Sequence, residues 1–113
     1  MTDDVRPEMS DLRRSADAES IRLKDSQHAL LVLFDYYRNL PVDRQIAAVE
    51  LISDWLLSDD EALRFDALAL VDEFGLKSTK PFLLVLAARL SASTAPGAKF
   101  ELEKVHRLAE VAD

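Results

Sequence analysis

The sequence contains no cysteine, only two glycines and four prolines among 113 residues, and no long apolar run. Without cysteine the chain forms no disulfide and offers no thiolate ligand for a metal. With so little glycine and proline it has little material for hairpin turns and long loops. The longest uncharged apolar run, residues 81–88, is too short to cross a bilayer, so we expect no membrane contact.

Motifs that carry catalysis or cofactor binding are also absent from the sequence. There is no glycine-rich phosphate loop, no cysteine nucleophile and no serine in a strand-to-helix elbow. The only histidines are His28 and His106, and the single Glu103-x-x-His106 spacing does not make a di-metal centre, which needs two such motifs and further carboxylates. We therefore predict no metal, no cofactor and no enzymatic activity.

Acidic residues are what the chain has in excess. It holds 21 Asp and Glu against 14 Lys and Arg, a formal net charge of −7. Such a chain repels a phosphate backbone, which disfavours direct nucleic-acid binding, and it attracts a basic partner. The alternative is that the acidity only maintains solubility. Residues 1–5 lack the basic and apolar regions of a secretion signal, and a cytoplasmic protein is our expectation.

The distribution of apolar residues predicts an all-α fold. Leu, Ala, Glu, Asp and Arg dominate, and no run of alternating β-branched residues occurs. Residues 1–25 hold seven acids and five bases with a thin apolar stripe, which predicts a flexible or weakly helical N-terminal arm. Residues 26–113 are predicted to form a single all-helical domain. Its five expected helices cover about 27–40, 44–57, 59–74, 80–90 and 98–112.

Capping residues mark the expected ends of these helices. Pro41 ends the first, because the residue before proline avoids the α region. Asp43 is the expected N-cap of the second helix. Ser58, with Glu61 three residues later, matches a capping box in front of the third helix. Gly75 stands where that helix would take a left-handed C′ residue.

One stretch of the sequence carries a family pattern. An aspartate-bearing turn, Leu57-Ser58-Asp59-Asp60, precedes the pair Leu63-Arg64 and an alanine-rich helix that closes at Phe74-Gly75. This stretch resembles a HEAT-type repeat, in which two antiparallel helices form each unit. The resemblance is specific over about residues 43–75.

The HEAT-like resemblance implies a five-helix antiparallel right-handed stack whose second helices line a concave surface, and a role in protein recognition. A second unit, residues 80–112, would follow, with Phe65 and Phe100 at comparable positions 35 residues apart. This second unit lacks the apolar-Arg pair. A compact helical bundle therefore stays open as the alternative architecture.

The candidate binding residues are mainly carboxylates near the third expected helix. Seven acids lie between residues 54 and 73, opposed only by Arg64. Asp59, Asp66 and Glu73 are spaced by seven, which predicts one strip along the helix. The simpler interpretation is a solvated helix face with acids placed favourably at the positive end of the helix dipole. The predicted partner-binding set is Asp59, Asp66, Asp72, Glu73, Tyr36 and Trp55.

Tyr36 and Trp55 enter this set because interfaces favour polar-tipped aromatic side chains. Packing into the core with the polar tip toward solvent is the alternative for both residues.

Charge and architecture together favour a non-catalytic protein-binding module. The first hypothesis is an immunity- or inhibitor-type protein that blocks a basic protein partner, such as a toxin or a nucleic-acid-processing enzyme, through its acidic surface. The alternative is an adaptor or structural subunit of a larger assembly that docks through apolar helix faces. Because the C-terminal third is slightly basic, head-to-tail self-association is also open.

Overall fold

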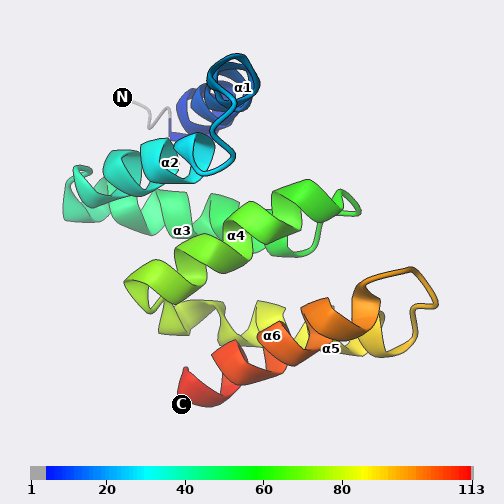
Figure 1. Ribbon diagram of the computed structural model, residues 1–113. Helices are drawn as coiled ribbons and strands as arrows, with labels where there is room; N and C mark the ends of the chain where they lie inside the picture. The colour runs from blue at the N-terminus through cyan, green and yellow to red at the C-terminus, as the bar shows by residue number, and fades with distance from the viewer. Residues whose placement is uncertain (1–4, 113) are drawn as a thin grey trace. The chain divides into compact units, whose positions relative to one another are not determined.

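The computed structural model describes residues 5–112, and these residues are almost entirely helical (Figure 1). The described residues form no strand, so the all-α prediction is confirmed. Residues 1–4 of the predicted arm and Asp113 lie outside the described part. No helix within 5–112 is long and apolar enough to cross a membrane. The helices are α1 (Val5–Leu23), α2 (His28–Arg38), α3 (Val42–Leu56), α4 (Glu61–Phe74), the short 3-10 turn η1 (Lys77–Thr79), α5 (Lys80–Ser91) and α6 (Ala98–Val111).

The chain gathers into two compact units, divided between Leu51 and Ile52. The first unit contains α1, α2 and most of α3, and the second contains the end of α3 with α4, η1, α5 and α6. Helix α3 is continuous across the division. The predicted separation of an arm, 1–25, from a domain, 26–113, stays a prediction.

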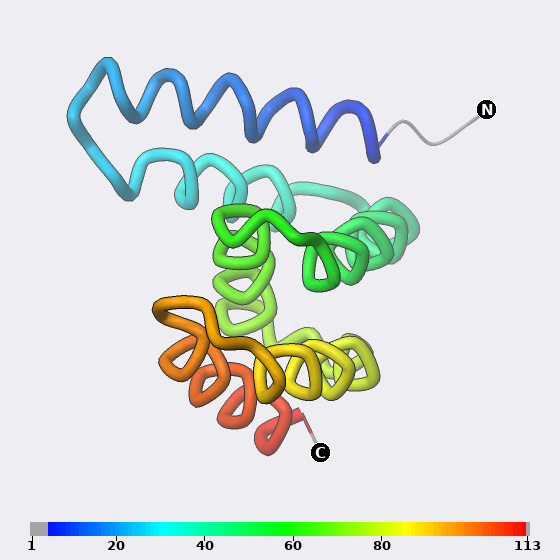
Figure 2. Tube along the Cα trace, turned by 90° about the vertical axis from the view of Figure 1, so that its right-hand side faces the viewer, coloured from blue at the N-terminus to red at the C-terminus, as the bar shows by residue number. Residues whose placement is uncertain are grey.

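In the first unit α1 and α2 lie antiparallel to each other (Figure 2). The thin apolar stripe of α1 provides the contact, because Met9 and Ala16, seven residues apart, are both buried. Leu33 and Tyr37 are the buried pair on α2, four residues apart on one face, as the helical spacing predicts. A stripe this narrow is enough to hold α1 against α2.

Polar contacts also join the three helices of the first unit. Glu8 on α1 accepts a hydrogen bond from the Tyr36 hydroxyl on α2. The same carboxylate forms an ion pair with Arg44 on α3, at 3.1 Å. Gln45 donates its side-chain amide to the Tyr37 carbonyl at 3.1 Å, which links α3 to α2 a second time.

In the second unit α6 lies beside both α4 and α5. Figures 1 and 2 show that α4 and α6 run in the same direction, whereas α5 runs opposite to α6. The core of this unit is aliphatic and nearly fully buried. Its members include Leu56, Leu68, Leu70, Leu83, Leu86 and Val105.

Two of the expected N-caps are wrong. Helix α3 begins at Val42, so Asp43 lies inside its first turn and does not cap it. Helix α4 begins at Glu61, two residues later than expected, and its N-cap is Asp60 rather than Ser58. Asp60 has the extended backbone of an N-cap residue, and its carboxylate accepts hydrogen bonds from the two N–H groups at 62 and 63, at 2.9 and 3.4 Å.

Ser58 instead stabilises the turn before α4, because its hydroxyl accepts the N–H of Asp60 at 3.0 Å. The expected end of this helix is confirmed. Gly75 has φ of 58°, the left-handed conformation that glycine adopts without a Cβ penalty.

Candidate partner-binding groove

The structure separates the predicted acidic set. Asp59 lies in the turn before α4, whereas Asp72 and Glu73 lie in the last turn of this 14-residue helix. All three residues are exposed. At 1.5 Å of rise per residue the two ends of the set are about 18 Å apart, so they do not form one cluster.

Asp66 and Trp55 need a correction, because both are buried, with 7% and 5% of their surface exposed. Neither side chain is open to a partner. On α4 the open stripe follows Ala62, Phe65 and Asp72, and Asp66 is turned about 100° from Phe65. The seven-residue spacing correctly puts residues on one helix face but does not tell which face is covered.

Tyr36 belongs to the first unit, where it is half-buried and its hydroxyl donates to Glu8. The acids of the predicted set belong to the second unit. Tyr36 and these acids therefore belong to different units of the chain.

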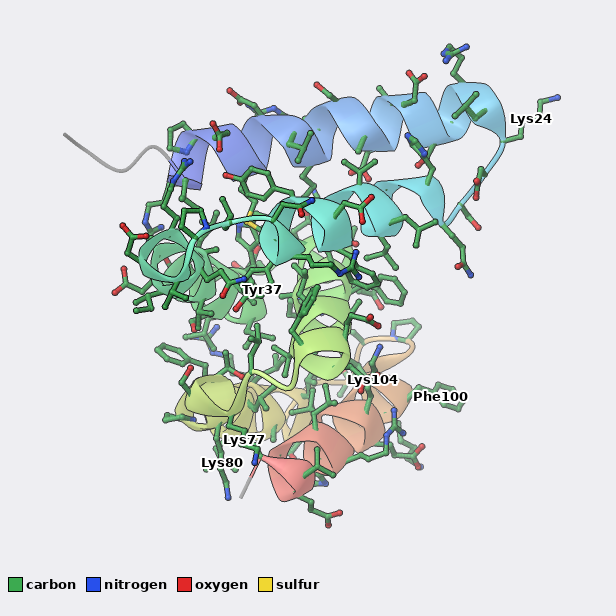
Figure 3. All side chains as sticks on the ribbon, turned by 90° about the vertical axis from the view of Figure 1, so that its left-hand side faces the viewer. Lys24, Tyr37, Lys77, Lys80, Phe100 and Lys104 are labelled. Carbon is green, nitrogen blue, oxygen red and sulfur yellow. The ribbon has the colours of Figure 1, made fainter. Side chains whose placement is uncertain are left out.

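A hollow in the second unit lies between α4 and α6. It has a volume of about 310 Å³ and combines apolar side chains with charged ones at its edge. Two large aromatic side chains on its walls are exposed, Phe65 at 52% and Phe100 at 77%. Figure 3 shows Phe100 projecting outward from α6, close to Lys104. We call this hollow the α4–α6 groove; its lining residues are Glu61, Phe65, Leu68, Gly97, Phe100, Glu101 and Lys104.

The start of α6 explains why the groove is open. Ala98 and Val105, seven residues apart, are buried, which turns Phe100 to the flank of the helix. Gly97 precedes the helix with φ of 84°, and a Cβ added there would lie 3.7 Å from a Glu61 carboxylate oxygen. The first turns of α4 and α6 therefore approach each other closely at this end of the groove.

An ion pair joins the two helices at the groove, since Glu101 is one of its lining residues. Arg64 Nε lies 2.7 Å from Glu101 Oε2, and Arg64 Nη2 lies 3.0 Å from Glu101 Oε1, a two-pronged contact between side chains only 14% and 11% exposed. Arg64 also donates to the Ser58 carbonyl at 3.0 Å. The hydrogen bond with Glu101 raises the pKa of Arg64 above its ordinary value. These two charges therefore compensate each other.

The remaining charges make one end of the groove negative. Lys104 Nζ lies 5.1 Å from the centre of the Phe65 ring, within the range of a cation–π contact. Glu61 is exposed at the groove edge, and Asp59 and Asp60 are exposed in the turn just before it. Three carboxylates thus surround the N-terminus of α4, beside two exposed rings.

A second hollow lies at the other end of the same two helices. It measures only about 50 Å³ and is lined mainly by apolar residues, including Val71, Leu76 and Leu108. This volume is much smaller than that of the α4–α6 groove, so this hollow offers less room for a side chain of a partner. The α4–α6 groove is thus the larger candidate site.

Among residues 5–112 no three His, Asp or Glu side chains gather in a way that could hold a metal ion. The comparisons with known proteins do not place the chain in a family. No family model, no curated protein and no solved structure matches it. The HEAT-like resemblance therefore stays a prediction.

Sequence reasoning named one residue of the acidic end, Asp59, but not the aromatic walls. The sequence pattern indicates Phe65 and Phe100 only as a pair at comparable positions of the two HEAT-like units. The sequence does contain a sign of them, because each is a large apolar residue that lies outside the regularly spaced buried residues of its helix. The Arg64–Glu101 pair gave no such signal, because opposite charges 37 residues apart are common in a chain that is 31% charged.

Proposed function

We propose that this chain is a non-catalytic protein-binding module of the inhibitor or immunity type, which captures a basic protein partner at the α4–α6 groove. The observation that carries the proposal is the pair of exposed rings, Phe65 and Phe100, beside the carboxylates of Asp59, Asp60 and Glu61. A cytoplasmic location of this chain, and a toxin or a nucleic-acid-processing enzyme as its partner, belong to the same proposal.

Physical reasons support each part of this surface. Exposed aromatic side chains that line one hollow are typical of interaction sites, and aromatic anchors supply much of the binding energy at interfaces. The net charge of −7 attracts a cationic partner over a distance and accelerates encounter. Asp72 and Glu73 contribute to that field from the far end of α4, whereas the buried Asp66 and Trp55 make no direct contact.

The alternative is an adaptor or structural subunit that docks through apolar helix faces. Exposed aliphatic side chains outside the groove favour it, namely Val42 and Ile46 in the first unit and Leu84 and Val85 in the second. Docking of this kind depends little on ionic strength.

Salt dependence of the complex separates the two functions. The partner is isolated from the native host with the wild-type chain as bait, and the Kd of the purified complex is measured at low and moderate ionic strength. Electrostatic capture predicts a basic partner and a Kd that weakens on the order of tenfold. An acidic partner, or a Kd that salt leaves unchanged, would overturn the proposal in favour of apolar docking.

A further inference from the structure

We propose that the α4–α6 groove binds a basic peptide segment of the partner, with one large apolar side chain seated between Phe65 and Phe100 and a Lys or Arg beside Glu61. This inference rests on the proposed function and specifies the chemistry of the bound segment. Three features of the groove carry it: its size, its charge and the position of Lys104.

The size of the groove fits a single apolar anchor. Its volume of about 310 Å³ lies at the lower end of the range for ligand-binding hollows. Leu68, only 1% exposed, forms an apolar floor, and the rings of Phe65 and Phe100 provide the walls. A large aliphatic or aromatic side chain placed there covers both rings at once.

The charge of the groove decides what flanks that anchor. Two cations near it are already engaged within the molecule, Arg64 with Glu101 and Lys104 over the Phe65 ring. Glu61 lies on the groove edge, with two further exposed carboxylates in the turn before it. A cation of the partner gains attraction there, whereas an acidic segment meets repulsion.

Lys104 makes the charge preference testable. Its Nζ occupies the face of the Phe65 ring and repels an incoming cation. Replacing Lys104 with Met keeps most of the chain length and removes the charge, so a basic segment should bind more tightly. The expected gain is about threefold, the size of a single exposed charge interaction.

A second copy of this chain is a poorer occupant of the groove. Each copy carries a net charge of −7, so two copies repel each other. Helix α1, which carries four arginines, is itself neutral, with four acids and four bases. The expected segment therefore comes from a different, basic protein.

The test begins with a random peptide library displayed on phage and selected on the full wild-type chain, with counter-selection on Phe100→Ser. The expected result is a consensus with one large apolar residue and at least one Lys or Arg within four positions of it. No consensus, or a consensus rich in Asp and Glu, would overturn the inference.

Calorimetric titration of the selected peptide against variants then locates the contact. Phe100→Ser and Glu61→Lys should each weaken binding more than tenfold, and Lys104→Met should strengthen it. The controls are Leu84→Ser, an exposed apolar residue on α5, and Asp72→Lys, the same charge reversal at the other end of α4. Both controls should change the Kd less than twofold. All altered positions except half-buried Lys104 are exposed, and circular dichroism checks that each variant folds.

The outcomes separate this inference from the proposed function. If the partner is basic and salt-sensitive but its affinity is unchanged by Phe100→Ser and Glu61→Lys, the groove is not the binding site. Electrostatic capture of a basic partner then still stands, but at another surface of the chain. If salt leaves the complex unchanged, the function itself fails. Sedimentation could instead show that the wild-type chain is a dimer and that Phe100→Ser is a monomer. The occupant of the groove would then be a second copy of this chain, and the inference would be overturned.

Discussion

At the residue scale, the Arg64–Glu101 pair is a two-pronged, mostly buried polar contact of the second unit. It joins α4 to α6, and the additional bond from Arg64 to the Ser58 carbonyl also fixes the turn before α4. Because both side chains are mostly buried, loss of either partner leaves the other with an uncompensated charge. The pair also lies at the α4–α6 groove, which Glu101 lines.

Glu101→Gln should lower the free energy of unfolding by about 2 kcal/mol, because a charge-assisted, two-pronged contact is lost in a mostly buried position. Urea unfolding followed by circular dichroism measures the change. The matched control is Asp35→Asn, which breaks the 2.7 Å pair with Arg38 on the surface of α2, where both side chains are more than half exposed. That control should cost less than about 0.5 kcal/mol. Equal losses would contradict the structural role of the pair.

Tyr37 should make the stability of the chain fall at alkaline pH. Burial raises the pKa of its phenol above the ordinary value of 10.0, so the unfolded chain releases the proton first. Stability is therefore full below pH 10 and decreases as the pH rises through 10 toward the raised pKa. In Tyr37→Phe this part of the decrease should vanish. Urea midpoints at neutral pH and above pH 10 test it, and an identical alkaline loss in both proteins would count against it.

At the element scale, α4 illustrates what the sequence could and could not predict. Its existence and its end at Gly75 followed from the apolar spacing and from the need for a residue with positive φ. Its start did not, because Ser58, Asp59 and Asp60 are all good N-cap residues and local sequence does not choose among them. Which of the three residues caps α4 depends on the backbone conformation of the turn after α3, and in the structure Asp60 has the extended conformation of an N-cap.

The N-cap assignment can be measured directly. Asp60→Ala should destabilise the chain by about 1 kcal/mol, because two N–H groups of α4 lose their acceptor. Ser58→Ala should cost less, since only the bond to the Asp60 N–H is lost. Asp60→Asn should stay close to wild type, as asparagine caps nearly as well. If Ser58→Ala lowered the free energy of unfolding more than Asp60→Ala, Ser58 would be the N-cap, as the capping box predicts.

The predicted strip of Asp59, Asp66 and Glu73 shows that local sequence also does not decide which face of a helix is exposed. Helix α4 is covered over a wide arc, with five buried residues, Asp66, Ala67, Leu68, Leu70 and Val71. When apolar residues occupy more than one flank, periodicity does not distinguish the open stripe from the covered one. The sequence thus indicated an acidic helix correctly but assigned Asp66 to the wrong side.

At the scale of the whole molecule, the sequence predicted the helical class and five of the helices, but not how α6 pairs with α4. That pairing depends on contacts such as Arg64 with Glu101 and Lys104 with Phe65, which connect residues 37 and 39 positions apart. No local rule fixes such partners. The candidate groove, being made by this pairing, was beyond sequence reasoning.

Helix α3 is the only covalent connection between the two units, and it is one uninterrupted helix. Glu50, exposed and one residue from the division, allows a test. Glu50→Pro should cost about 3 kcal/mol or more, because it removes an intrahelical hydrogen bond and places the ring against the preceding turn. Glu50→Ala is the control and should stay near wild type. Urea unfolding measures both, and a small loss in the proline variant would show that α3 tolerates a break there.

The burial of Trp55 gives the molecule a spectroscopic use. It is the only indole in the chain and belongs to the second unit, whereas both phenols, Tyr36 and Tyr37, belong to the first. Indole emission shifts to longer wavelength on contact with water, so its colour reports on the second unit. Tyrosine absorbance reports on the first. The native chain can therefore be followed unit by unit during denaturation without any attached dye.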